Sequence, residues 1–296
     1  HAAEVISPSQ QPSPGIYSMW PFTSGPVVPV LRFTGPIGMA TPLRQGLSLA
    51  TVAGGIERAF KLSRIPTVAV IVNSPGGSPV QSSLIFKRLR QMAEKHKKKV
   101  YVFCDDVAAS GGYYLAVAGD EIYADACSII GSIGAISGGF GFVEAIEKLG
   151  VERRIYASGT AKSQLDPFKR ENPEDVARLT QILEEIHDAF IGVVKERRGA
   201  QIETPDTEVF SGAFWSARRA MELGLIDGIT DLRTKMQELH GEKVRLRVVP
   251  LSRGGLLSML RRPNMERLCP TGSGGALADD LLSAAEARAL WYRYGL

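Results

Sequence analysis

The chain has 296 residues and a formal net charge of +4 at pH 7, with 44% hydrophobic and 22% charged residues. This length and composition are those of an ordinary globular protein, and they allow one large domain or two smaller ones. Much of the local basicity lies in Lys95 to Lys99 and in Arg261-Arg262. Because neither run is interleaved with aromatic residues, we expect no nucleic-acid partner.

The three cysteines, Cys104, Cys127 and Cys269, are scattered and show no zinc-type spacing. Cys104 and Cys127 lie in apolar segments, so we expect buried thiols rather than a disulfide framework. The sequence therefore predicts neither a metal site nor a bound cofactor.

No run of about 20 consecutive apolar residues is present, so the sequence predicts no transmembrane helix. The chain begins with His1 rather than Met, which indicates a truncated start or the remnant of a tag. We therefore expect a membrane-associated or cytoplasmic protein, with any anchor lying outside this sequence.

Residues 1–26 are rich in Pro, Ser and Gly and predict an extended lead-in. Beyond them, short β-prone apolar runs alternate with segments of helical periodicity. The expected strands lie within residues 27–33, 68–72, 100–104, 121–124, 128–135 and 152–157. The expected helices are residues 51–62, 82–96, a segment directly after Ser110, 142–149, 172–198 and 216–223. This alternation predicts a layered α/β fold with right-handed crossovers, followed by a partly helical extension over residues 251–296.

The helix expected over residues 172–198 has the clearest signals. Asn172 is a favourable N-cap and Pro173 suits the first helical position. Apolar residues recur along one face, from Val176 to Val194, at helical spacing. We expect this stripe to form part of the core or a contact between subunits.

Ser110 follows an expected buried strand and precedes Gly111-Gly112 and an apolar, helix-compatible segment. Near a helix start, the N–H groups of the two glycines would have no intrahelical acceptor and could bind an anion. The glycines also leave room for a substrate backbone to approach. The alternative is that Ser110 only caps the helix.

A serine nucleophile needs a general base within hydrogen-bond reach. The usual base is histidine, but all four histidines are expected at the surface: His1, His96, His187 and His240. A lysine can replace it if its pKa falls from about 10.4 to about 7–8 through burial or nearby positive charge. Of the twelve lysines, Lys162 is the one that follows an expected strand among small and hydroxyl residues. On this pattern alone, Lys162 is either the base or an ordinary loop lysine.

A glycine-containing turn, Asn73 to Pro79, follows the expected strand 68–72. Backbone N–H groups of Gly76 or Gly77, together with that of Gly111, could form an oxyanion hole. Phosphate binding is the competing interpretation of this turn. It has little support, since the chain has neither GxxxxGK[ST] nor GxGxxG.

Four motifs follow one another along the chain: Asn73-Ser74-Pro75-Gly76-Gly77, Ala109-Ser110-Gly111-Gly112-Tyr113-Tyr114, Gly131-Ser132-Ile133-Gly134 and Ser158-Gly159-Thr160-Ala161-Lys162. In order and spacing they resemble the signal peptide peptidase A (SppA) family, over residues 68–229. The resemblance implies an oligomeric protein with a ClpP/crotonase-like α/β fold of repeated β-β-α units, in a peptidase domain spanning residues 27–250.

The resemblance also implies a Ser-Lys dyad, with Ser110 as nucleophile and Lys162 as general base. Ser132 matches a position whose hydroxyl helps to orient the lysine, and Gly77 and Gly111 match the oxyanion hole. The implied function is that of a serine endopeptidase. It would hydrolyse signal-peptide remnants or other apolar, unfolded peptides through an acyl-enzyme.

The sequence departs from the family pattern at both ends. It lacks the N-terminal anchor that many members carry, and the tail beyond about residue 250 matches no part of the pattern. The long form of the family has two tandem copies, and this chain has one. In short forms neighbouring subunits of a ring complete the dyad together, so the resemblance implies a homo-oligomer, of which an octamer is one form.

The sequence is also compatible with two other functions. A crotonase-type acyl-CoA enzyme shares the paired oxyanion donors. A non-catalytic oligomeric scaffold could instead bind peptides, with the basic amphipathic piece over residues 256–268 as a membrane contact.

Overall fold

The computed structural model describes residues 25–38, 46–159, 161–251, 285 and 288–294. Most of the expected lead-in and the whole basic piece over residues 256–268 lie outside these residues. The membrane contact proposed for that piece therefore stays a prediction. Among the described residues, no helix is both long and apolar enough to span a bilayer.

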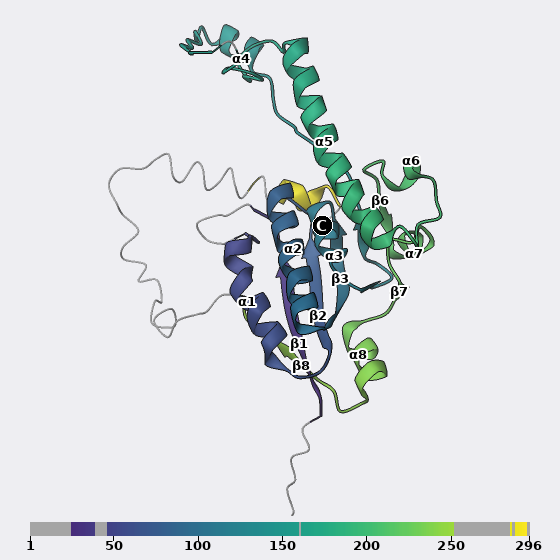
Figure 1. Ribbon diagram of the computed structural model, residues 1–296. Coiled ribbons are helices and arrows are strands. Elements are labelled where there is room, and N and C mark those ends of the chain that lie inside the picture. Colours follow the sequence, from purple (N-terminus) through teal and green to yellow (C-terminus); the bar gives the residue numbers. More distant parts are fainter. Residues whose placement is uncertain (1–24, 39–45, 160, 252–284, 286–287, 295–296) are drawn as a thin grey trace, which may run out of the picture.

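A central, mostly parallel sheet organises the molecule (Figure 1). Its strands are β1 (Val27–Thr34), β2 (Thr67–Ser74), β3 (Lys99–Ala109), β4 (Glu121–Ala124), β5 (Ile129–Gly131), β6 (Phe214–Ser216), β7 (Gly228–Ile229) and β8 (Arg245–Val248). The main order is β6-β5-β3-β2-β1-β8, with β4 pairing to both β3 and β7. All pairs are parallel except β5 with β6. The α/β fold class is thus confirmed. The oligomeric state of the protein stays a prediction.

Helices cover the two faces of this sheet unequally. They are α1 (Leu49–Leu62), α2 (Pro79–His96), α3 (Gly111–Ala116), α4 (Val143–Lys148), α5 (Pro173–Arg198), α6 (Asp206–Val209), α7 (Ala217–Glu222) and α8 (Leu232–His240). The first three pack on one face, where Leu31, Val70 and Val102 point into the main core. On the other face a smaller core joins Ala69 and Phe103 to α8. Strands with apolar residues on both faces are typical of a parallel sheet covered on both sides.

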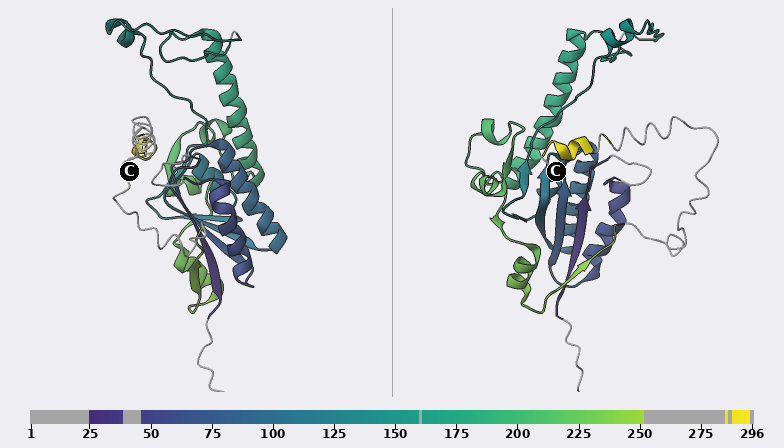
Figure 2. Two further views of the ribbon diagram at one scale, coloured as in Figure 1. Left: turned by 90° about the vertical axis from the view of Figure 1, so that its left-hand side faces the viewer. Right: turned by 180° about the vertical axis from the view of Figure 1, so that it is seen from behind.

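An arm extends from this body and contains α4, residues 149–159 and 161–172, and the N-terminal part of α5 (Figures 1 and 2). Helix α5 begins as predicted, with Asn172 accepting a hydrogen bond from the Glu174 amide at 3.0 Å. Its buried residues, Phe190, Val194 and Arg198, all belong to the end that packs on the body. The apolar stripe is therefore core only at that end, and along the arm it joins none of the core clusters that the described residues form.

Most expected strands and helices are confirmed to within a few residues, but three expectations are wrong. Residues 152–157 form no strand, because this exposed part of the arm has no described strand beside it to pair with. Strand β3 continues past Cys104 to Ala109, across the exposed Asp105 and Asp106, where the register with β2 shifts. Cys104 is buried as expected, whereas Cys127 lies exposed in the turn before β5.

Candidate active site

Ser110 stands in the turn between β3 and α3 with unusual backbone angles. Its φ of 52° and ψ of −124° lie in a region that non-glycine residues rarely occupy. The amide of Ser110 donates to the Gly131 carbonyl at 2.8 Å, and the Tyr114 amide donates to the Ser110 carbonyl at 3.0 Å. The hydroxyl, in contrast, makes no capping hydrogen bond. A strained strand-to-helix turn that presents an uncommitted hydroxyl is typical of a nucleophilic serine rather than of a helix cap.

The glycine turn after β2 lies directly against this serine. Gly76 and Gly77 have φ values of 103° and 139°, which other residues rarely adopt. A Cβ added to Gly76 would lie 2.8 Å from the Ser110 Cβ, so a side chain there would collide with the serine. A Cβ added to Gly111 would lie 3.3 Å from the Gly77 nitrogen. The two loops therefore meet at Ser110.

Two backbone amides in these loops are free to bind an anion. The turn after β2 is held to Ile37, whose amide donates to the Gly76 carbonyl at 2.8 Å and whose carbonyl accepts from Ser78 at 2.9 Å. Neither the Gly77 amide nor the Gly111 amide donates to any residue that the structure describes. Paired donors beside a nucleophile are the arrangement that stabilises an oxyanion.

Ser132 lies at the same edge of the sheet. Gly131 pairs with Ala109 in the β3–β5 ladder, so Ser110 and Ser132 are the residues that follow two paired positions. Ser132 is buried, and its amide donates to the Ala213 carbonyl at 2.6 Å. The structure thus gathers four of the five predicted site residues where β2, β3 and β5 end.

Lys162 lies elsewhere in the chain. It belongs to the exposed segment between α4 and α5, two elements that meet at the outer end of the arm (Figure 1). Its backbone amide donates to the Gly159 carbonyl at 3.3 Å, and its side chain makes no hydrogen bond or ion pair with the described part of the chain. Within a single chain the structure does not bring Lys162 to Ser110.

The described histidines offer no alternative base. The Nε2 atom of His240 forms a hydrogen bond with the Thr67 hydroxyl at 3.0 Å. Burial lowers the pKa of the His240 ring. The Nε2 atoms of His96 and His187 are buried without a partner among the residues described. None of the three forms a hydrogen bond with Ser110.

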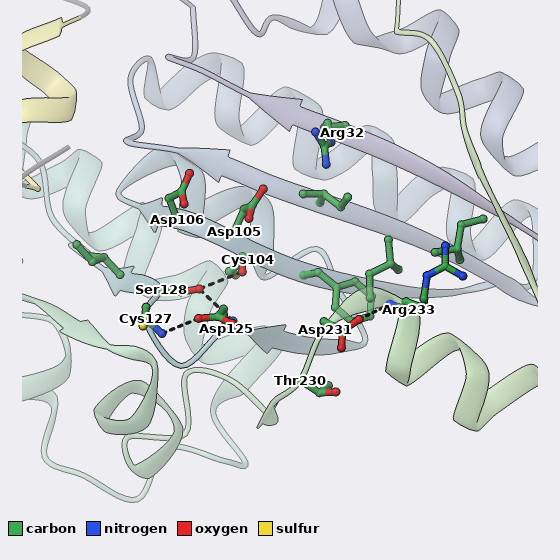
Figure 3. Close-up of a pocket in the computed structure, with 15 residues that line it drawn as sticks. Arg32, Cys104, Asp105, Asp106, Asp125, Cys127, Ser128, Thr230, Asp231 and Arg233 are labelled. Atoms are coloured by element: carbon green, nitrogen blue, oxygen red, sulfur yellow. Dashed lines mark hydrogen bonds between the residues drawn. The ribbon is translucent and has the colours of Figure 1, made fainter. Parts of the chain in front are cut away.

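A pocket of about 580 Å³ lies on the sheet face opposite α1 and α2 (Figure 3). Asp105, Asp106 and Asp125 form one side, over an apolar floor that includes Phe103. Although Asp105 as a residue is exposed, partial desolvation of its carboxyl group raises its pKa, and the charge of Asp106 adds to the effect. No local motif predicts this pocket, and its one signal in the sequence is the pair of consecutive aspartates within a strand. No group of side chains in the described residues has the arrangement of a metal site.

The pocket is linked to the glycine turn. The Asn73 side chain donates to Asp106 at 2.6 Å and accepts from the Val107 amide at 3.3 Å. Asn73 directly precedes the turn that carries Gly76 and Gly77. The acidic end of the pocket therefore lies beside the loop with the free amides.

Comparison with known proteins gives the chain a family context. Residues 92–245 match the model of peptidase family S49. This match contains Ser110, Ser132 and Lys162, whereas Gly77 lies ahead of it.

Individual relatives differ in how much of their length is matched. The chain is 49% identical over 273 residues to "Na(+)/H(+) antiporter NhaA" of Brucella abortus, covering 91% of this chain and 37% of that protein. It is 28% identical over 251 residues to "Serine protease SPPA, chloroplastic" of Arabidopsis thaliana, covering 79% of this chain and 36% of that protein. It is 31% identical over 182 residues to "Protease 4" of Haemophilus influenzae, covering 60% of this chain and 29% of that protein. The chain thus spans little more than a third of the Brucella protein, whose name describes ion transport, and the other two relatives are named as proteases.

Proposed function

The chain belongs to peptidase family S49, and from that premise we propose that it is a serine endopeptidase acting on apolar, unfolded peptides, including signal-peptide remnants. The observation that carries the proposal is the strained turn at Ser110, which has a hydroxyl without a capping hydrogen bond and meets the loop of Gly77, whose amide and that of Gly111 donate to no described residue. These groups suit acyl transfer, in which a nucleophile attacks a carbonyl and two donors hold the resulting oxyanion.

In the proposed mechanism, neutral Lys162 accepts the proton of Ser110 while its Oγ attacks the peptide carbonyl. The amides of Gly77 and Gly111 stabilise the oxyanion of the tetrahedral intermediate. When the tetrahedral intermediate collapses, the C–N bond of the peptide breaks and Lys162 gives its proton to the leaving amine. The acyl half of the peptide then stays bound to Ser110 as an ester. Lys162 then deprotonates a water that attacks the ester, which releases the acid and restores the serine.

The lysine must be neutral to act as a base. Burial of a lysine side chain favours its neutral form, because desolvation penalises the charged ammonium group. In one chain Lys162 is exposed. We therefore propose that Lys162 becomes buried, and meets Ser110, only when copies of the chain assemble, with Ser132 of the receiving copy orienting the amine.

The arm supports this homo-oligomeric arrangement. It exposes large apolar side chains that a single chain leaves in solvent: Leu149 at 76%, Val151 at 55% and Tyr156 at 93%. Clustered exposed apolar residues mark surfaces that bind other proteins. An arm seated on a neighbouring copy would bury these side chains and deliver the segment that carries Lys162.

Labelling with a fluorophosphonate, followed by mass spectrometry of the modified peptide, tests the proposal. We expect a single modified residue, Ser110, and loss of both labelling and peptide cleavage in Ser110→Ala and Lys162→Ala with unchanged melting temperatures. Full cleavage by either variant would refute the dyad. An unlabelled Ser110 in a chain that binds acyl-CoA would favour a crotonase-type enzyme instead.

A further inference from the structure

The turn that carries Lys162 is followed by contacts that close the outer end of the arm (Figure 1). The turn ends at Leu165, whose φ of 52° is a backbone angle that leucine rarely adopts. Beyond it, the amide of Phe142 donates to the Pro167 carbonyl at 2.6 Å, which joins the start of α4 to the chain just ahead of α5. The rings of Phe142 and Phe168 also pack, with centroids 5.6 Å apart. The chain between these contacts is therefore a closed loop, and Lys162 lies close to one of its ends.

Asp166 lies between the turn and this closure, and its side chain is buried in an otherwise exposed arm. The side chain is 5% exposed, and its Oδ1 atom accepts a hydrogen bond from the Phe168 amide at 3.0 Å. Its Oδ2 atom lies 3.5 Å from Nε of Arg153, whose guanidinium carbon in turn lies 5.3 Å from the centroid of the Phe168 ring. Because a buried carboxylate is unfavourable without a partner, Arg153 acts as its counter-ion.

The arm has little else to order it. None of its residues joins the core clusters that the described part of the chain forms. Holding a segment in one conformation requires contacts that offset the lost conformational entropy. Here such contacts converge on residues 166–168, directly after the Lys162 turn. A general base must lie within hydrogen-bond reach of the proton it accepts, so the conformation of this turn bears on catalysis.

We propose that Asp166 is a positioning residue for the general base. Its carboxylate, fixed by Arg153 and by the Phe168 amide, holds the turn in one conformation. Lys162 then reaches Ser110 of a neighbouring copy with the same geometry at every site. The inference rests on the proposed peptidase function and adds to it a residue outside the dyad. Because Asp166 acts through the lysine, its effect belongs to the chain that supplies the lysine rather than to the chain that supplies the serine.

Kinetics of full-length variants measure this role. Asp166→Ala should lower kcat about a hundredfold with KM nearly unchanged, because a displacement of about 1 Å suffices for such a loss and the proposed nucleophile and oxyanion donors lie in other loops. Asp166→Asn keeps an oxygen for the Phe168 amide and loses the charge that pairs with Arg153, so its kcat should lie between the two. Arg153→Gln leaves Asp166 in place and should also lower kcat, which keeps the proposal testable if Asp166→Ala folds poorly.

Glu152→Gln is the matched control on the same arm. It removes the ion pair between Glu152 and Arg154, in which both side chains are largely exposed. Exposed pairs of this kind contribute little to order, so kcat should stay at the wild-type value.

Mixed oligomers show which chain needs Asp166. A refolded mixture of Ser110→Ala and Lys162→Ala chains should be active only where an intact serine meets an intact lysine from another copy. Adding Asp166→Ala to the Ser110→Ala chain, which supplies the lysine, should lower the recovered activity about a hundredfold. Adding it to the Lys162→Ala chain, which supplies the serine, should leave the recovery unchanged.

The outcomes separate the two proposals. Equal losses from both placements would mean that Asp166 only maintains folding or assembly, and would overturn its positioning role. Wild-type kcat in both Asp166→Ala and Arg153→Gln would refute that role alone. An inactive mixture from an active wild type would overturn the delivery of Lys162 to a neighbouring copy. A wild-type protein that neither cleaves peptides nor reacts with a fluorophosphonate at Ser110 would refute the peptidase itself, and the inference with it.

Discussion

The amide of Ser110 donates a hydrogen bond to the carbonyl oxygen of Gly131 at 2.8 Å. This bond continues the β3–β5 ladder by one step and fixes the strained serine turn to the strand that precedes Ser132. Because the contact is between backbones, it is independent of the Ser132 hydroxyl. A substitution that removes the Ser132 hydroxyl should therefore affect the orientation of the base and leave the geometry of the serine turn unchanged.

We predict that Ser132→Ala lowers kcat by about tenfold or more, because its hydroxyl would position the base rather than carry the proton itself. The hydroxyl makes no hydrogen bond with the described residues, so unfolding free energy should change by no more than about 0.5 kcal/mol. Peptidase kinetics and urea denaturation measure the two effects.

Ser128→Ala is the matched control for that experiment. The buried Ser128 hydroxyl donates to the Cys104 carbonyl at 3.1 Å and accepts from the Asp125 amide at 3.0 Å. Its loss should cost about 1–3 kcal/mol of stability with kcat unchanged. A Ser132→Ala protein with full kcat would contradict the positioning role.

A second prediction concerns the strain at Ser110. Ser110→Ala and Ser110→Gly both remove the hydroxyl, but only glycine adopts a φ of 52° with a ψ of −124° at little cost. Relief of strain outweighs the extra entropy of an unfolded glycine, so Ser110→Gly should be more stable than Ser110→Ala by about 1 kcal/mol. Chemical denaturation of the two inactive proteins measures this, and equal midpoints would show that the turn stores no strain.

Much of the fold could be predicted because its signals are local. The run at residues 68–72 predicts β2 from its β-branched residues, and Asn172 with Pro173 predicts the start of α5. The extension of β3 was missed because Asp105 and Asp106 interrupt the apolar pattern while backbone pairing continues. A strand at 152–157 was expected from composition alone, and composition cannot supply the neighbouring strand that pairing requires.

The candidate site likewise has a part that local sequence signals predict and a part that they do not. The proximity of Ser110, Ser132, Gly77 and Gly111 could be predicted because each follows the carboxyl end of a parallel strand, and such ends share one edge of the sheet. Their roles stay a prediction. In the proposed assembly, the place where Lys162 acts would depend on packing between chains, which no pattern near Lys162 encodes.

A third prediction tests whether two copies share the dyad. Ser110→Ala and Lys162→Ala should each be inactive, but oligomers refolded from an equal mixture should recover about a quarter of wild-type activity. In a ring, half the sites keep Ser110, and half of these neighbour a copy that keeps Lys162. Cleavage of a quenched peptide measures the recovery, and oligomers of either variant alone are the controls. A mixture as inactive as its parts would place both residues of each dyad in one chain.

The last prediction concerns the acidic pocket. Burial, with repulsion from Asp106 added, raises the pKa of Asp105 above its unfolded value near 3.9. Between the unfolded and the folded pKa, the folded chain binds more protons than the unfolded chain, so this group lowers stability as pH rises through that window. Asp105→Asn removes the titration and should raise the urea midpoint relative to wild type at pH 7, with a smaller difference at pH 3. Asp188→Asn, at an exposed position on α5 outside the pocket, is the control substitution. A difference between Asp105→Asn and wild type that is the same at both pH values would mean that Asp105 titrates alike in the folded and unfolded chain.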